Sequence, residues 1–315
     1  MSDFFSEAWS VYIGAATIIG LVACIVLLLV AARSRPMSSD NTTGHVWDED
    51  LTELNNPLPR WWMWLFVMTV VFAGIYLGLY PGLGSLAGRL GWSSVAQYEQ
   101  EKQQARATAA PVYASFAPLA FEALARDPRA TAVGERLFAN NCAGCHGSDA
   151  KGSKGFPNLT DTDWLYGGTP EKIVESITQG RQGTMPPMAA AVGNADDVRD
   201  LANYVLSLSG SEENKTSAAY GRSKFTACAA CHGAKGTGNP LIGAPNLTDD
   251  IWLHGWGVPA VTAMINNGKH SVMPAHAERL SAEQIRVLAA YVWGLSNRGE
   301  NPPPAPKDGT LAAAR

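Results

Sequence analysis

The chain has 315 residues, of which 46% are hydrophobic and 17% are charged, and its formal net charge is −4. This slightly acidic balance provides no basic surface of the kind that binds nucleic acid, so no nucleic-acid partner is expected. Five cysteines are too few for a disulfide scaffold, and four of them lie in two CxxCH motifs. The length accommodates two modest domains and additional segments.

Two uncharged apolar runs, residues 11–32 and 61–82, predict two transmembrane helices in a lipid bilayer. Each run reaches the length of about 20 residues that a helix needs to cross the hydrocarbon core. A cleavable signal peptide is the alternative for the first run, but the preceding residues contain Asp3 and Glu7 and no basic residue. The second run begins with tryptophans and ends with tyrosines, which favour membrane interfaces.

The distribution of arginines predicts the orientation of these spans. The connecting loop, residues 33–60, holds three arginines, whereas residues 1–10 hold no basic residue. Because basic loops stay in the cytoplasm, we expect residues 1–10 and everything from residue 83 onward to be periplasmic. The expected location is therefore the inner (cytoplasmic) membrane of a bacterium, with two spans.

Residues 83–130 read as a periplasmic helical connector, divided by Pro111, Pro118 and Pro128. At the other end of the chain, residues 299–315 are rich in proline and alanine and are expected to form a disordered tail.

The region between connector and tail contains two copies of one pattern. Each copy has a Gly-x-x-x-Phe segment, a CxxCH motif, a Pro-Asn-Leu-Thr segment and a Met-Pro pair, in that order. Matching positions lie 86 to 88 residues apart. Two related domains, residues 131–210 and 211–298, are the simplest explanation.

The CxxCH motif is the attachment signature of haem c. Its two thiols form thioethers with the porphyrin, and the adjacent histidine is placed to ligate the iron. A zinc site or a redox disulfide would leave the histidine after each cysteine pair unexplained. Two covalently bound haem c groups are therefore expected. The attachment and proximal residues are Cys142, Cys145 and His146 in the first copy and Cys228, Cys231 and His232 in the second.

A second axial ligand to each iron is expected from Met185 and Met273, each about 40 residues after the motif histidine. A thioether ligand stabilises reduced iron and raises the potential, as suits an electron carrier. Met188 is the next candidate in the first copy. The second copy also has His254, His270 and His276, which lack histidine counterparts in the first copy and are expected at the surface or around the site.

Each motif histidine can be paired with the methionine of its own copy or with that of the other copy. On spacing, we favour pairing within each copy, His146 with Met185 and His232 with Met273. An exchange of the methionine-bearing loops between the two copies uses the same residues and stays open.

Both copies resemble class I cytochrome c domains, so the predicted fold is all-α: two transmembrane helices followed by two tandem cytochrome c domains. In that fold the Gly-x-x-x-Phe segment lies on an N-terminal helix that packs closely on a C-terminal helix. The C-terminal helices are predicted at residues 196–208 and 281–295, with Asn194 (or Asp196) and Ser281 as N-caps. No catalytic residues are expected.

Nearly the whole chain resembles the diheme CcoP (FixP) subunits of cbb3-type cytochrome c oxidases. The most specific segments are GHVWD at residues 44–48 and LNNPLPRWW at residues 54–62, directly before the second apolar run. The resemblance implies a subunit that accepts electrons from a soluble or membrane-bound donor cytochrome c. It implies that the electrons pass to a monohaem cytochrome c subunit and that a separate haem-copper catalytic subunit reduces oxygen to water. The alternative is a membrane-bound diheme cytochrome c subunit of a dehydrogenase.

Overall fold

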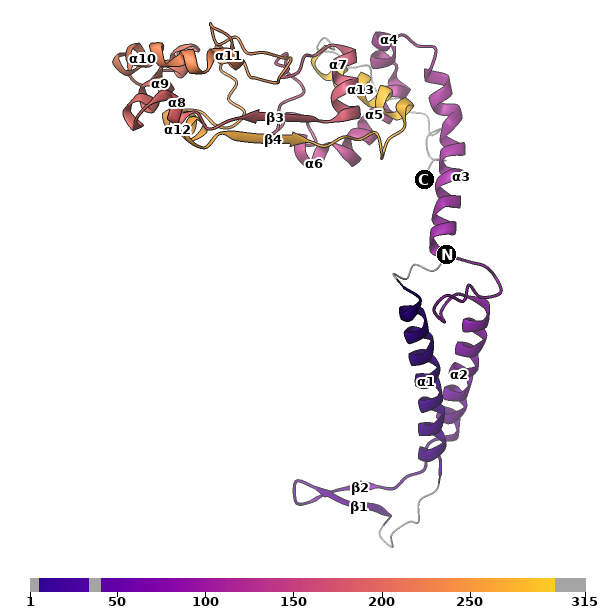
Figure 1. Ribbon diagram of the computed structural model, residues 1–315. Coiled ribbons are helices and arrows are strands. Elements are labelled where there is room, and N and C mark those ends of the chain that lie inside the picture. Colours follow the sequence, from indigo (N-terminus) through magenta and orange to yellow (C-terminus); the bar gives the residue numbers. More distant parts are fainter. Residues whose placement is uncertain (1–5, 34–40, 298–315) are drawn as a thin grey trace. The chain divides into compact units, whose positions relative to one another are not determined.

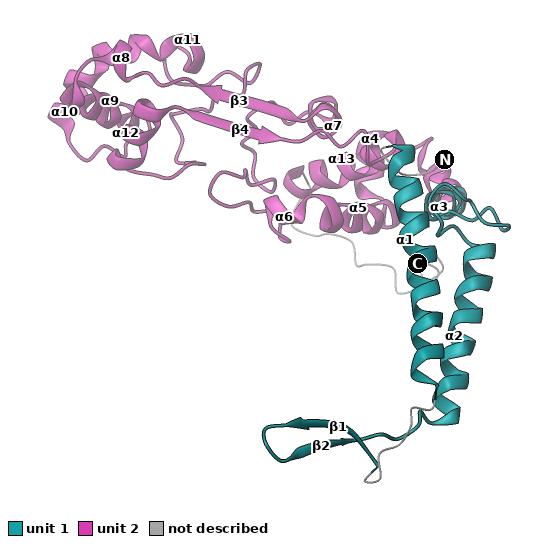
Figure 2. Ribbon diagram, turned by 60° about the horizontal axis from the view of Figure 1, so that its bottom comes forward, with its two compact units in different colours: residues 1–108 teal, residues 109–315 magenta. Residues whose placement is uncertain are grey.

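The structure is a computed structural model that describes residues 6–33 and 41–297. It contains two compact units, residues 1–108 (unit 1) and residues 109–315 (unit 2), which we describe separately (Figure 2). Both units are mostly helical, as the sequence predicts. The tail predicted to be disordered, residues 299–315, lies outside the described residues.

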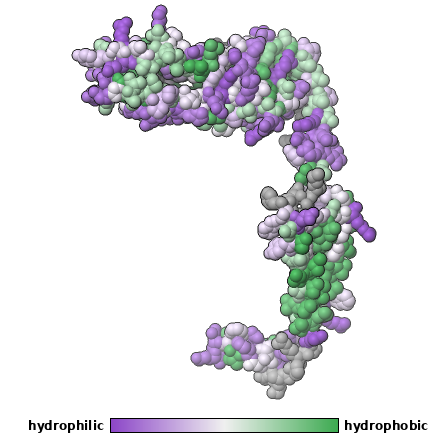
Figure 3. Space-filling model, in the orientation of Figure 1, coloured by the Kyte–Doolittle hydropathy of each residue, from purple (hydrophilic) through white to green (hydrophobic). Residues whose placement is uncertain are grey.

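The two apolar runs of unit 1 form α1 (Glu7–Ala31) and α2 (Arg60–Leu79). Each helix is long and apolar enough to cross a membrane, and neither has a buried residue. Apolar surface covers both of them (Figure 3). The start of α1 is tied to the segment after α2, because the backbone N–H and the hydroxyl of Ser85 both bond Ser10 Oγ, at 2.6 and 2.7 Å. The two helices therefore run antiparallel.

The predicted loop between these helices contains a β-hairpin, which the all-α prediction omitted. Strand β1 (Thr42–Trp47) pairs antiparallel with β2 (Leu51–Leu54). The turn between them holds Asp48 and Glu49 at positive φ, 47° and 72°. The indole N–H of Trp47 donates to the Glu53 carboxylate at 2.8 Å across the hairpin. The threonines of this segment, Val46 and Trp47 are of residue types that are enriched in strands.

The predicted helical connector is largely α3 (Ser94–Phe116). We predicted that Pro111 divides the connector, but Pro111 lies inside α3. A proline removes one backbone donor, and a helix of 23 residues retains its other backbone hydrogen bonds. By contrast, Pro128 occupies the first turn of the next long helix, and Asp127 caps it by accepting from the backbone N–H groups of Arg129 and Ala130.

Unit 2 packs as two lobes. Lobe A comprises residues 117–180 and 273–297, and lobe B comprises residues 185–268; each has its own buried core. The helices of lobe A are α4 (Phe121–Arg126), α5 (Pro128–Asn141), α6 (Ala143–His146), α7 (Pro170–Gln179) and α13 (Ala282–Asn297). Those of lobe B are α8 (Ala189–Val192), α9 (Ala195–Ser207), α10 (Lys215–Gly221), the 3-10 helix η1 (Arg222–Ala227), α11 (Ala229–His232) and α12 (Val258–Asn267).

The two C-terminal helices begin as predicted. Asn194 caps α9 in a reciprocal arrangement with Asp197. The Ser281 hydroxyl accepts from the backbone N–H of Gln284, whose side chain accepts from the backbone N–H of Ser281. Each pair satisfies two backbone donors that the first turn of a helix leaves free.

The helices pack across the two sequence copies. Helix α13, from the second copy, packs on α5 and α7 of the first, and α9, from the first, packs on α10, η1 and α12 of the second. A Cβ added at Gly134 would lie 2.5 Å from Tyr291 Cβ on α13, and one at Gly221 would lie 2.1 Å from the Asp200 carbonyl oxygen on α9. The predicted role of both glycines in close helix packing is confirmed. The partner helix belongs to the other copy, contrary to the prediction of packing within each copy.

The chain crosses between the lobes along a second two-stranded sheet that the all-α prediction also missed. Strand β3 (Arg181–Met185) pairs antiparallel with β4 (Lys269–Met273), in the register Arg181↔Met273 and Met185↔Lys269 (Figure 1). Strand β3 leaves α7 of lobe A and ends at lobe B. Strand β4 leaves α12 of lobe B and ends at lobe A.

Matching backbone contacts fix both ends of this crossover. The N–H of Met188 donates to the Ile265 carbonyl at 2.8 Å, and the N–H of His276 donates to the Ile177 carbonyl at 3.0 Å. The two donors are 88 residues apart in sequence, and so are the two acceptors. Unit 2 therefore has an approximate twofold relation between its copies.

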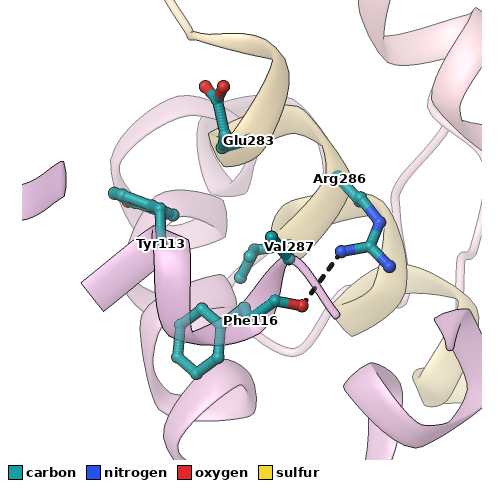
Figure 4. Close-up of a pocket in the computed structure, with 6 residues that line it drawn as sticks. Tyr113, Phe116, Glu283, Arg286 and Val287 are labelled. Atoms are coloured by element: carbon teal, nitrogen blue, oxygen red, sulfur yellow. Dashed lines mark hydrogen bonds between the residues drawn. The ribbon is translucent and has the colours of Figure 1, made fainter. Parts of the chain in front are cut away.

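The end of α3 is fixed to lobe A. Arg286 on α13 donates from Nη1 to the Phe116 carbonyl at 3.1 Å (Figure 4). Its Nη2 donates to the Leu119 carbonyl. Phe116 is 2% exposed and shares a core cluster with Val287. The connector thus becomes part of the packed unit at its last turn.

Two candidate haem sites

Each CxxCH motif forms a single helical turn after a buried phenylalanine. In lobe A the N–H groups of Cys145 and His146 donate to the Cys142 carbonyl at 3.1 and 2.9 Å. In lobe B the corresponding N–H groups donate to the Cys228 carbonyl at 3.1 and 3.0 Å. The first cysteine of each pair is half-buried and the second is exposed. This turn holds two thiols and one imidazole close together, as attachment of one porphyrin requires.

A backbone carbonyl orients each motif histidine. His146 Nδ1 donates to the Pro157 carbonyl at 3.0 Å, and His232 Nδ1 donates to the Pro245 carbonyl at 3.1 Å. Because a carbonyl only accepts, the hydrogen must lie on Nδ1, and the lone pair of Nε2 is left for a metal. Both histidines are buried. These are the bonds that normally fix the tautomer of a metal-ligating histidine.

Sequence reasoning missed the two prolines as functional residues. Pro157 and Pro245 begin the repeated Pro-Asn-Leu-Thr segment, which the sequence analysis used only to align the copies. The available signal was their recurrence at a similar distance after each CxxCH motif. The Asn158 side chain accepts from both the N–H and the hydroxyl of Thr160 and holds this turn in place.

The surroundings of the motif residues disfavour the charged forms of the first cysteine of each pair and of His146. Burial, with a smaller effect of neighbouring Cys145, raises the pKa of the Cys142 thiol to about 11. Burial and Cys231 likewise raise the pKa of Cys228. Redox-active and metal-binding thiols instead need a lowered pKa. Burial also lowers the pKa of His146, against the opposing effect of its bond to Pro157, and so favours the neutral imidazole that ligates metals.

The structure brings each candidate methionine to the motif of the other copy. Met273 packs against the core of lobe A together with Cys142, and Met185 packs against the core of lobe B together with Cys228. Packing of each methionine beside the motif of its own copy, as the favoured pairing requires, is therefore not the arrangement found. The backbone at Gly180, φ +72°, lies close to the backbone at Met273. A Cβ added at Gly180 would lie 2.3 Å from the Met273 carbonyl oxygen.

Both lobes contain buried polar atoms that can donate a hydrogen bond, which fits a group that carries acceptors. Among the described residues, Trp252 Nε1 and Thr262 Oγ1 in lobe B and His276 Nδ1 in lobe A are buried without a hydrogen-bond partner. Such groups are costly unless a partner is supplied. Haem c carries two carboxylates, which are strong acceptors, so the chemistry of both sites fits this cofactor.

The three remaining candidate histidines occupy different environments. His270 lies exposed on β4, with Nδ1 3.0 Å from the Thr184 hydroxyl. His254 is half-buried, and its pKa is lowered by burial and then by Lys269 and Lys154. His276 is 8% exposed, close to the lobe A site. Their expected positions at the surface or around the site agree with the structure.

Both the single domains and the whole chain are similar to subunits of cbb3-type oxidases. Residues 39–87 match the N-terminal domain of cytochrome oxidase-cbb3, FixP, and residues 129–205 and 217–292 each match cytochrome c oxidase, cbb3-type, subunit III. A cbb3-type cytochrome c oxidase subunit CcoP from Rubrivivax gelatinosus is 61% identical over 94% of this chain and 97% of its own length.

More distant relatives agree. A FixP subunit from Azorhizobium caulinodans is 41% identical over 81% of this chain and 92% of its own length. A CcoP subunit from Cereibacter sphaeroides is 38% identical over 81% of this chain and 94% of its own length. The chain therefore belongs to the CcoP (FixP) family of cbb3-type cytochrome c oxidase subunits.

Proposed function

We propose that this chain is the electron-entry subunit of a cbb3-type oxidase, which takes electrons from a donor cytochrome c and passes them to a monohaem cytochrome c subunit. Oxygen is then reduced to water in a separate haem-copper subunit. The observation that carries the proposal is the pair of equivalent CxxCH sites, each with an oriented histidine and a methionine beside it. Family membership supports the oxidase over a dehydrogenase.

The residues of each lobe have distinct tasks. A bound haem c takes up and gives back one electron. Cys142 and Cys145, or Cys228 and Cys231, hold it covalently, so it is retained through repeated turnover. The Pro157 and Pro245 carbonyls keep the imidazoles in the ligating tautomer. The packed apolar cores keep water away from most of the group, and fixed surroundings tune its potential.

Axial ligation in the proposed arrangement is exchanged between copies. His146 and Met273 belong to the lobe A site, and His232 and Met185 belong to the lobe B site. The support is that each methionine packs with the motif cysteine of the other copy and follows a strand that crosses between lobes. Met188 packs beside Met185 against lobe B and is the competing ligand there.

The proposed topology has two spans in a bacterial inner membrane, with residues 33–60 in the cytoplasm and unit 2 in the periplasm. The antiparallel pair α1 and α2 and the arginines of the loop support it. A reporter active only after export should work when fused after Arg315 and fail when inserted near Asp48. The reverse pattern would contradict the topology.

Purification of the native complex tests the function. The tagged chain, isolated from membranes in mild detergent, should carry two haems that survive denaturation. It should co-elute with b-type haem, copper and a monohaem c subunit, and the complex should oxidise a reduced cytochrome c with uptake of oxygen. Co-elution with a dehydrogenase, without b-type haem and copper, would establish the alternative function instead.

A further inference from the structure

One of the matched positions at which the two haem sites differ lies next to the axial methionines. Three residues after the methionine, the first copy has Met188 and the second has His276. The backbone N–H groups of these two residues make equivalent bonds, to the Ile265 and Ile177 carbonyls, so they occupy equivalent places in lobes B and A. The apolar Met188 packs into the core of lobe B. Its counterpart in lobe A is a polar, titratable side chain.

His276 is buried in a way that requires a partner. It is 8% exposed, and its Nδ1 has no hydrogen-bond partner among the residues that the structure describes. It lies near enough to His146 to lower the pKa of that imidazole. Its chain segment follows Met273, which packs against the same core as Cys142. The side chain therefore belongs to the surroundings of the lobe A haem site.

We propose that His276 is a positioning residue of lobe A, whose Nδ1–H donates a hydrogen bond to a carboxylate of the haem held at Cys142 and Cys145. The inference rests on the proposed haem site of lobe A. His276 Nδ1 makes no hydrogen bond with the thioether of Met273, and a haem carboxylate is the other acceptor that the site would offer. A thioether is a weak acceptor and a carboxylate is a strong one, so the carboxylate is favoured.

This bond makes the two haems unequal. The positive end of the N–H dipole faces a negatively charged edge of the haem in a site of low dielectric, and it favours the reduced form of the iron. Lobe B has Met188 at the same position, and a methionine side chain donates no hydrogen bond that would favour the reduced haem. The structure thus assigns to one side chain a specific contribution to the potential of one haem.

Replacing His276 with the residue of the matched position tests the proposal. In the purified full complex, His276→Met should lower the ratio of reduced to oxidised haem in lobe A about three- to tenfold at fixed ambient potential, tenfold being about 59 mV. The lobe B haem should keep its ratio. His276→Asn, whose amide nitrogen takes the place of Nδ1 and retains a donor there, should stay within about twofold of the wild type. A variant with both Cys228 and Cys231 replaced by Ala lacks the covalently held lobe B haem and so identifies which signal belongs to lobe B.

Two results would overturn the proposal: an unchanged potential in His276→Met, or an equal shift in His276→Asn. A measurement on the wild type covers the case in which His276→Met loses its haem. Replacing water with deuterium oxide should shift the resonance Raman propionate-bending band of the lobe A haem, and no shift would refute the bond. If the proposed haem site of lobe A were wrong, lobe A of the wild-type protein would lack bound haem. That result is distinguishable from a failure of the His276 proposal alone.

Discussion

Two residues of the same type, Met185 and Met273, pack across the two sequence copies. Each is half-buried against the motif of the opposite copy rather than its own. The immediate cause lies in the preceding glycines. Gly180 and Gly268, both at positive φ, end a helix and pack against the Met-Pro backbone of the other copy, where a Cβ would clash.

Exchanged ligation predicts which haem responds to each methionine substitution. Met273→Ala should remove the weak near-infrared thioether band of the haem bound at Cys142 and leave the haem at Cys228 six-coordinate. Met185→Ala should do the opposite. Absorption and magnetic circular dichroism of the oxidised protein measure both, and site-specific loss of one haem assigns the bands.

Met188→Ala is the matched control for Met185→Ala, because the two methionines lie in the same segment and pack against the same core. It should leave both thioether bands in place. If Met185→Ala instead affected the haem bound at Cys142, ligation would follow the sequence copies and the exchange would be wrong.

At the level of elements, the contact between α5 and α13 joins the N-terminal helix of one copy to the C-terminal helix of the other. A Cβ at Gly134 would lie 2.5 Å from Tyr291 Cβ and 3.2 Å from the Val287 carbonyl oxygen. Helix propensity alone predicts that Gly134→Ala stabilises the protein by up to about 1 kcal/mol. The steric clash costs more than the gain in helix propensity, so we expect the free energy of unfolding to fall by about 1–3 kcal/mol.

Gly144→Ala is the control for this substitution. Gly144 lies in the short helix α6, an added Cβ would meet nothing within 4 Å, and the second copy already has Ala230 at this position. Thermal unfolding of the haem-loaded protein should therefore change for Gly134→Ala and hardly at all for Gly144→Ala. Equal transitions for the two variants would contradict the packing of α5 on α13.

An ion network secures the start of β3. Glu175 on α7 accepts from Arg181 Nη1 at 2.6 Å and from Lys172 Nζ at 2.7 Å, and the Arg181 guanidinium lies over the Tyr166 ring at 4.8 Å. The hydrogen bonds from Arg181 and then Lys172 lower the pKa of Glu175 from 4.5 to about 2. Because the pKa is lowered in the folded state, the stabilisation is full above pH 4.5 and is lost as pH falls through 2.

Glu175→Gln should therefore lower the melting temperature at pH 7, and the difference from the wild type should shrink between pH 4.5 and pH 2. Glu171→Gln, one turn earlier on α7 at an exposed position, should have little effect at either pH. A difference for Glu175→Gln that grows as the pH falls would show that the carboxylate does not act through its ionised form.

At the scale of the whole molecule, the exchange makes the two lobes interdependent. Residues 117–180 form most of lobe A, but its last helix and Met273 come from beyond residue 272. A chain cut at residue 210, the boundary that the repeat suggests, separates lobe A from α13 and lobe B from α9. The two sequence copies should not fold independently.

Chain truncation tests this dependence. A protein ending at residue 210 should lack methionine ligation at the haem bound at Cys142 and should be cut rapidly by protease. Co-expression with residues 211–315 as a separate exported chain should restore both properties, because it returns Met273 and α13. A stable fragment of residues 1–210 with a Met-ligated haem would show that each copy folds by itself.

Local patterns in the sequence determined much of this protein. Two uncharged runs predicted α1 and α2, a repeated CxxCH motif predicted two haem sites, and capping residues such as Asn194 and Ser281 marked the starts of the C-terminal helices. These features depend on residues close together in the chain. Hydropathy, thiol spacing and backbone capping act over a few residues, so they can be recognised without the fold.

Only the tertiary structure decided which copy completes which site. Both copies offer one histidine, one methionine, one N-terminal and one C-terminal helix at matching positions, so the list of ligands is the same for either pairing. The strands β3 and β4 could not be recognised from the sequence either, since each spans only five residues and pairs with residues 84 to 92 positions away. Pairing between distant segments depends on how chain direction is set at Gly180 and Gly268, and that geometry places each methionine in the opposite lobe.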